Sequence, residues 1–444
     1  MSTLRTPVRH LLLLGALCCT TLLPGRYAVA QNDDDGTRFP LAYEGAFRVP
    51  EGPTDETSFD FGGTALMFDA DRRSLWLVGH DHHQRVAEIS IPDIRSVDTI
   101  GELDTARLLT PFRDLLQGRR SQVGSNDSKI GGLLRIADEW IVSAWVYYDA
   151  AGEQSRSHFR VRTDGTVIGP VQIGPDERDA GFVSGYMAPI PPEYRNRLGG
   201  RAFTGQCCIP IISRTSQGPA LSAFDPEDIG VRTPVPRTDL LGYPMEFPTL
   251  GTWEEGEPTL YNGNTKVAGV VLPEGTRSVL FFGRVGLGEF CYGVGTSERS
   301  QHGRPVPGSA DDRYCYDPDD PEKGSHGYPY AAQVWAYDAE DLIAVARDQR
   351  RPWDVLPYAA RTFSLPFDRG LMTVGGVAYD PAERRIFLSA LLQDDFRPII
   401  HVFRLGELGE PPAGTPNGGI FPSPDRPAPR RPTSKPPVGR AVPR

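Results

Sequence analysis

Short apolar runs separated by polar turns recur along the chain, and each group of runs begins at a pair of small residues. After the pair come an apolar run, a charged or tight turn, a second run, a variable loop and a third run. This order is typical of a repeated antiparallel sheet. The pairs, which we call glycine steps, are Gly62-Gly63, Gly131-Gly132, Gly199-Gly200, Ala268-Gly269 and Gly375-Gly376. In the third repeat the predicted strands that follow the step are 202–204, 209–212 and 220–224.

The first and last repeats agree beyond hydrophobicity. The turn after the first run carries Arg72-Arg73 in one and Arg384-Arg385 in the other. In both repeats another arginine, Arg85 or Arg397, lies 12 residues beyond the second arginine of the pair. The two repeats therefore share a register.

A weaker apolar run precedes each glycine step, which makes four strands in each of five repeats. The pattern predicts an all-β fold, a β-propeller of five four-stranded blades. The last repeat has three runs of its own, so we expect the N-terminal run 42–49 to complete it and close the ring. Because the repeats are longer than usual blades, six or seven blades stay open, with the extra strands in 284–332 or 176–198.

Composition and charge agree with this fold and limit the partners. The chain of 444 residues has 48 Gly and 42 Pro, spaced as turns, and no segment of the body keeps a long helical period. We expect a propeller domain at 41–410, with a long loop insertion at 284–332, after a flexible segment at 31–40. The whole chain has a formal net charge of −10, but its basic residues are concentrated at the two ends, and residues 31–410 carry −18, which argues against nucleic acid as a partner. We expect a monomer.

The two ends of the chain read as segments outside the fold. Arg5 and Arg9 precede the apolar run 11–23, and Ala28-Val29-Ala30 follows, which predicts a signal peptide at 1–30 cleaved after Ala30. The run is too short for a comfortable transmembrane segment. We therefore expect a periplasmic or extracellular protein. Residues 411–444 form a Pro-rich basic tail, expected to be disordered and able to contact the cell envelope.

Four cysteines remain after the signal peptide. An even number in an exported chain fits disulfides, and Cys291 and Cys315 are predicted to pair within the insertion. Cys207 and Cys208 are either a vicinal disulfide or two buried thiols, and packing statistics favour the thiols.

Propeller topology sorts the polar loops onto two faces. Loops between second and third strands share one face with the approaches to the first strands, and that face is the usual ligand entrance. Two arginines there, Arg214 and Arg284, follow the second strands of neighbouring repeats and could clamp a carboxylate or sulfate. The predicted ligand-binding residues are Arg214, Arg284, Tyr186, Trp253 and His326.

Metal and cofactor signals are weak. His80-Asp81-His82-His83 places three imidazoles in four residues, and an extended loop would put His80 and His82 on one side as metal ligands. Without a second ligand pair of metal spacing, a hydrogen-bonded loop is favoured. The carboxylates of the acidic run 317–322 are candidate ligands for Ca²⁺, but a solvated acidic turn is favoured there. No cofactor is expected.

The repeat pattern over residues 41–405 resembles uncharacterised secreted bacterial β-propellers, and it is also similar to five-bladed glycosidases. The second resemblance implies acidic residues as base, modulator and acid, and Asp60, Asp127 and Glu246 lie near the starts of three repeats. The first expectation is an exported propeller that binds a polar or anionic small ligand or a glycan at the channel entrance. A glycoside hydrolase and a non-catalytic protein-interaction scaffold are the alternatives.

Overall fold

The computed structural model describes residues 40–125, 127–176, 180–208, 215–254 and 260–407. The predicted signal peptide, the C-terminal tail and Arg214 lie outside these residues, as does the predicted strand at 209–212. The described fold is all-β: five sheets have four antiparallel strands each, and a sixth sheet has three strands.

The first three of the four-stranded sheets follow one another along the chain. They consist of β2 (Leu66–Asp69), β3 (Ser74–Val78), β4 (Val86–Ser90) and β5 (Leu108–Arg113); β6 (Ser128–Ile136), β7 (Glu139–Val146), β8 (His158–Val161) and β9 (Val167–Val171); and β10 (Met187–Pro189), β11 (Ala202–Thr204), β12 (Leu221–Phe224) and β13 (Arg237–Leu241).

The other two four-stranded sheets include longer strands, and one uses the strand nearest the N-terminus. They consist of β14 (Lys266–Val271), β15 (Ser278–Gly286), β19 (Tyr330–Asp338) and β20 (Ala359–Phe363); and β21 (Val374–Asp380), β22 (Arg385–Asp394), β23 (Arg397–Leu405) and β1 (Leu41–Arg48). Three short helices lie in connections: α1 (Ala180–Val183), α2 (Pro192–Leu198) and α3 (Ala339–Ala346).

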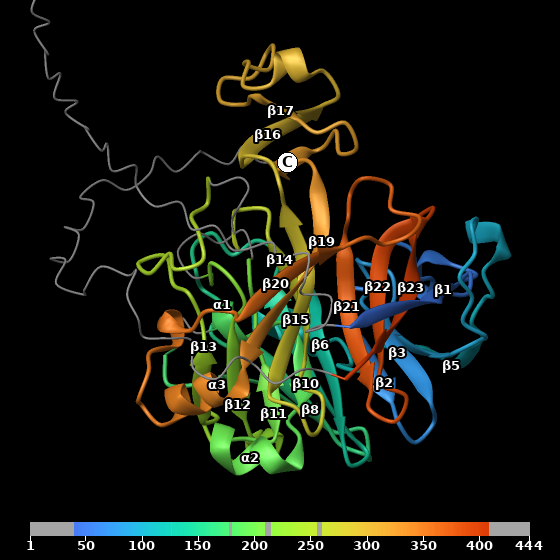
Figure 1. The fold of residues 1–444 in the computed structure, drawn as a ribbon. Helices are drawn as coiled ribbons and strands as arrows, with labels where there is room; N and C mark the ends of the chain where they lie inside the picture. The colour runs from blue at the N-terminus through green and yellow to red at the C-terminus, as the bar shows by residue number, and fades with distance from the viewer. Residues whose placement is uncertain (1–39, 126, 177–179, 209–214, 255–259, 408–444) are drawn as a thin grey trace, which may run out of the picture.

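The first strands of the five sheets bring the sheets together in a propeller-like arrangement (Figure 1). They contact one another in the order β2, β6, β10, β14 and β21, and β21 contacts β2. Buried apolar side chains fill the spaces between neighbouring sheets, as where β14, β15 and β19 pack on β21 and β22.

Three of the five glycine steps coincide with β-bulges in these first strands, in β6, β14 and β21. The register of β6 shifts between Ile130 and Gly132, and that of β14 shifts between Val267 and Gly269. A Cβ atom at Gly131 would overlap the backbone of Ser184 and Gly185, which lie in the approach to the neighbouring first strand, β10. The step therefore permits a close approach of backbones that a larger residue would block.

The predicted partner of the N-terminal run is confirmed. β1 pairs antiparallel with β23, with Leu41 opposite Leu405 and Phe47 opposite Ile400. Phe47 is fully buried. Strands from the two ends of the described chain therefore belong to one sheet.

The third repeat was assigned wrongly. Residues 202–204 were predicted as its first strand but form β11, the second strand, and the first strand is β10. Gly199 does not open a strand; it ends α2 in the left-handed conformation, with φ of 84°. The residue at this regularly spaced position is glycine because it caps a helix, a role that also favours glycine.

The insertion forms a separate small sheet of β16 (Cys291–Thr296), β17 (Tyr314–Tyr316) and β18 (Lys323–His326). This insertion sheet stands beyond the upper ends of the other sheets and continues from β15 and β19 (Figure 1). It is no blade, and 176–198 holds β10 with α1 and α2, so neither stretch contains a further four-stranded sheet within the described residues.

The disulfide between Cys291 and Cys315 is confirmed, with the two Cα atoms 5.7 Å apart. Cys207 and Cys208 are also joined, so the favoured interpretation as two thiols is wrong. Disulfides are typical of oxidising, exported compartments. Among the described helices, none has the length and apolar character needed to cross a membrane.

Candidate functional site

Two cations face each other where β14 begins and β15 ends. Lys266 and Arg284 are partners in the register of these antiparallel strands. Side chains directly opposite on one face lie about 5 Å apart at Cβ. The chain leaves β15 just beyond Arg284 to enter the insertion sheet, so the two cations lie at its base.

Arg284 is a buried guanidinium with few partners. Its side chain is 8% exposed, Nη1 donates to the carbonyl of Leu371 at 2.7 Å, and the guanidinium lies 4.6 Å from the ring centre of Tyr330. Its Nε has no hydrogen-bond partner. Burial lowers the pKa of Arg284, and Tyr330 and the carboxylates of Asp320, Asp317 and Asp368 oppose this effect. The aspartates act from a distance, since no described carboxylate lies within 4.0 Å of the guanidinium.

Lys266 is exposed at the same place. The positive charge of Arg284 lowers the pKa of Lys266 to about 7, partial loss of hydration acts in the same direction, and Asp320 opposes them. Because the Lys266 side chain is exposed to water, loss of hydration lowers its pKa less than the charge of Arg284 does. No described carboxylate lies within 4.0 Å of the Lys266 ammonium either. An anion placed here would relieve the repulsion of both cations.

A corresponding lysine in another repeat has the partner that Lys266 lacks. Lys129 precedes its glycine step by two residues, as Lys266 does. Its ammonium contacts the carboxylate of Asp81 at 2.5 Å and lies 5.8 Å from the ring centre of Tyr147. At the same position of the repeat, the lysine of β6 is neutralised by a carboxylate, whereas the lysine of β14 faces a second positive charge.

The histidine loop is a turn, not the extended loop that was predicted. The backbone N–H of His83 donates to the carbonyl of His80, and the N–H of His82 donates to Nδ1 of His80 at 3.2 Å. Nδ1 of His80 therefore accepts a hydrogen bond, while His82 and His83 are exposed. The carboxylate of Asp81 accepts a hydrogen bond from the ammonium of Lys129. The loop between β3 and β4 is thereby joined to β6.

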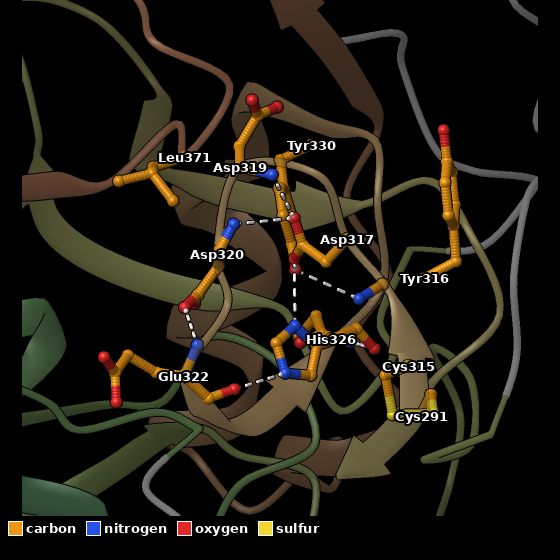
Figure 2. A network of polar contacts seen from close by, with 12 residues as sticks. Cys291, Cys315, Tyr316, Asp317, Asp319, Asp320, Glu322, His326, Tyr330 and Leu371 are labelled. Carbon is orange, nitrogen blue, oxygen red and sulfur yellow. Dashed lines mark hydrogen bonds and ion pairs between the residues drawn. A yellow bond between two sulfur atoms is a disulfide. The ribbon is translucent and has the colours of Figure 1, made fainter. Parts of the chain in front are cut away.

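Asp317 is the centre of a polar network at the base of the insertion sheet (Figure 2). Its Oδ2 accepts from the hydroxyl of Tyr330 at 2.7 Å and lies 3.0 Å from Nδ1 of His326. Its Oδ1 accepts the backbone N–H groups of Asp319 and Asp320, both at 3.2 Å. Asp317 is 1% exposed, so the predicted solvated acidic turn is wrong at its first residue.

His326, one of the predicted ligand-binding residues, is buried in the same network. Burial lowers its pKa, but the hydrogen bond and negative charge of Asp317 outweigh this effect, and the net pKa is raised. For Asp317, burial raises the pKa, but the hydrogen bonds from His326 and Tyr330 outweigh it, and the net pKa is lowered. Among the described residues, Asp317, Asp320 and His326 form a cluster whose candidate metal-ligand atoms all lie within 4.8 Å of one another.

Two of the expected aromatic ligand residues are used in packing. Tyr186 is 5% exposed, and its hydroxyl donates to the carbonyl of Ala220 at 2.7 Å. Trp253 is half-buried and stacks between Tyr261 and Phe290, with both ring centres 5.8 Å away. Its indole is therefore engaged in stacking with two other rings.

The three acidic residues suggested by the glycosidase resemblance do not form one described cluster. Asp127 and Glu246 are exposed and Asp60 is half-buried. No described hydrogen bond, ion pair or candidate metal cluster joins any two of them. Two surface cavities, of about 370 and 340 Å³, lie elsewhere and contain none of the predicted site residues.

Sequence reasoning missed Lys266 and Tyr330. Tyr330 follows the acidic run 317–322 by a few residues, so its closeness to Asp317 was a usable signal. Lys266 begins an apolar strand and carries no motif. Its meeting with Arg284 depends on the strand register.

No family model and no curated protein matches the sequence. Solved structures are similar in fold at low identity. A DUF4221 family member from Bacteroides vulgatus is 6% identical, covering 83% of this chain and 99% of its own, with a TM-score of 0.35. Raptor from Chaetomium thermophilum is 10% identical over 84% of this chain and 30% of its own, with a TM-score of 0.31. A mutant α-L-arabinanase from Cellvibrio cellulosa is 8% identical over 79% and 96%, with a TM-score of 0.37. At these values the comparisons assign neither a family nor an activity.

Proposed function

We propose that the chain is an exported five-bladed β-propeller that binds a small carboxylate-bearing or sulfated ligand, with an acidic saccharide as the favoured class. The ligand would lie at the base of the insertion sheet. The observation that carries this proposal is the opposition of Lys266 and Arg284 without a described carboxylate within 4.0 Å. A buried guanidinium is rarely left without an anionic partner, because its desolvation is costly.

The five-bladed ring is supported by the closed order of contacts between the first strands and by the pairing of β1 with β23. Export is supported by the predicted signal peptide and by the two disulfides. An acidic saccharide is favoured over a simple anion because aromatic side chains stand exposed near Lys129, two repeats away in the order of the first strands, where the sugar rings of an oligosaccharide could stack. Tyr147 is 56% exposed and Tyr148 is 77% exposed.

The test is calorimetric titration of the purified protein with oligogalacturonate and with its neutral methyl ester. We expect binding of the acid and not of the ester, and about tenfold or greater loss of affinity in Lys266→Met, because one of two charge-assisted contacts is removed. Lys129→Met is the matched control, since that lysine is already paired, and it should change affinity less than about twofold. Equal binding of acid and ester, or equal effects of the two variants, would contradict the proposal.

A further inference from the structure

A buried imidazole nitrogen points at a carboxylate oxygen in the network around Asp317 (Figure 2). Nε2 of His326 lies 3.1 Å from the carbonyl of Glu322, and a carbonyl can only accept. An ionised carboxylate also only accepts, so a neutral imidazole, with one N–H, can satisfy only one of its two partners. With the hydrogen on Nε2, Nδ1 has a lone pair and no hydrogen. That nitrogen, in a side chain 1% exposed, faces Oδ2 of Asp317 at 3.0 Å.

Two acceptor atoms at this distance repel each other unless a cation lies between them. The cation is either a proton, which makes His326 an imidazolium, or a metal ion bound by both atoms. Oδ2 of Asp317 also accepts from Tyr330, and both backbone contacts of Oδ1 hold the carboxylate in place. The position of the Asp317 carboxylate is therefore the same whether the cation is a proton or a metal ion.

We propose that Asp317, Asp320 and His326 bind a divalent transition metal ion at the base of the insertion sheet. The carboxylate of Asp320 belongs to the same cluster. With a proton on His326 the three side chains keep one net negative charge, which Arg284 and Lys266 offset only from a distance, whereas a divalent ion bound by them neutralises both carboxylates directly. An imidazole with two carboxylates suits Zn²⁺ or Mn²⁺ better than Ca²⁺, which prefers six to eight oxygen ligands.

The surroundings of His326 match those of a metal ligand. A ligating histidine usually donates its other N–H to a carboxylate or a backbone carbonyl, which fixes the ring, and the carbonyl of Glu322 serves here. Ligands about 2 Å from a tetrahedral ion lie about 3.3 Å apart, close to the Nδ1–Oδ2 distance. The candidate ligand atoms lie up to 4.8 Å apart, so the widest of these distances has to shorten when the ion binds. Asp320 is only half-buried, so its side chain has room to move toward the ion.

The disulfide holds two sides of this site. Cys291 is the register partner of His326, and Cys315 lies two residues before Asp317. Its bond to Cys291 thus ties the strand of His326 to the loop of Asp317. A site fixed in this way loses less entropy when the ion binds.

The experiment uses the full purified chain after dialysis against EDTA, with Zn²⁺ as the probe and Co²⁺ for absorption spectra. We expect one equivalent of bound Zn²⁺, a Co²⁺ spectrum of a site with one imidazole, and about 100-fold weaker binding in His326→Gln and Asp320→Asn. Asp319→Asn is the matched control, because it changes the exposed neighbouring carboxylate, and its affinity should stay within about twofold. Reduction of the disulfide should weaken binding in the wild type.

Zinc binding below one equivalent, or weakened equally in Asp319→Asn and Asp320→Asn, would overturn the proposal. An Nδ1–H resonance of His326 that persists in excess Zn²⁺ at neutral pH would also overturn it, because the proton would then occupy the metal position. Thermal unfolding of the metal-free variants separates loss of binding from loss of fold. If His326→Gln does not fold, Asp320→Asn alone decides. Oligogalacturonate binding measured in EDTA keeps this test independent of the proposed function.

Discussion

Lys129 and Lys266 stand at the same position of two repeats, two residues before the glycine step, and differ in the charge that each one meets. The ammonium of Lys129 contacts Asp81 at 2.5 Å, whereas Lys266 lies opposite Arg284. Repetition of the fold thus supplies an internal reference. The paired lysine shows how a nearby carboxylate neutralises this position, and the unpaired one is where we propose that an anionic ligand binds.

The first prediction is a pH dependence of anion binding. Since the pKa of Lys266 is lowered to about 7, the free protein loses this positive charge as pH rises through 7. Affinity for oligogalacturonate should therefore fall about tenfold between pH 6 and pH 8. Titrations at pH 6, 7 and 8 check this, and Lys266→Met should show a flat profile. A profile of equal slope in that variant would assign the dependence to another group.

The second prediction concerns the stability of the ligand-free protein. A lowered pKa in the folded state means that the unfolded chain binds more protons between pH 7 and 10.5, so this group makes the fold less stable as pH falls toward 7. Lys266→Met removes the repulsion and should raise Tm by about 1–3 °C at pH 6. Lys129→Met should lower Tm, because it leaves Asp81 without its ion-pair partner. A lowered Tm in Lys266→Met would mean that the lysine has a stabilising contact.

The meeting of Lys266 and Arg284 illustrates what the sequence could not predict. Arg284 was identified because the predicted second strand ended just before it, on the face expected to bind ligands; in the structure it lies within β15. Without the bulge between Val267 and Gly269, Lys266 would oppose Val285 instead. A one-residue change of register moves side chains to other partners, and neither the presence nor the exact place of a bulge follows from apolar alternation.

The strands themselves were largely predictable where the repeats are regular. The alternation located β2, β7, β15 and β22 because each is a short apolar run between turns. It failed at β10, which has three residues and follows a helical turn, and where Gly199 imitates a glycine step. The disulfide of the insertion was predictable because two lone cysteines in one loop have few other partners.

The third prediction is a loss of stability in acid through two buried histidines. Burial lowers the pKa of His158 and of His401 to about 3, and both are fully buried. Nδ1 of His158 contacts Ser157 at 2.8 Å and Nε2 contacts Thr204 at 3.0 Å, so the neutral ring is already satisfied. Since the unfolded chain takes up protons below about pH 6.5 and the folded chain does not, stability should fall as pH drops from 6.5 toward 3.

Between pH 7 and 5 each histidine should contribute about 2 kcal/mol to this loss, measured as the free energy of unfolding in urea. His158→Gln should reduce the slope of stability with pH by about half. The matched control is His82→Gln, at an exposed position, which should keep the wild-type slope. An unchanged slope in His158→Gln would show that other groups cause the acid sensitivity.

The last prediction tests the close approach at the glycine steps. Alanine at Gly131 would place its Cβ against the carbonyl oxygen of Ser184 and the backbone of Gly185, which belong to the approach to the neighbouring first strand. Backbone cannot rotate away as a side chain can, so the two strands must separate. We expect Gly131→Ala to lower the free energy of unfolding by about 1–3 kcal/mol. Gly101→Ala is the control, because nothing lies within 4 Å of its added Cβ, and its effect should stay within about 0.5 kcal/mol. If urea unfolding gives equal stabilities for the two variants, the glycine steps serve the bulge conformation alone and not the packing of one first strand on the next.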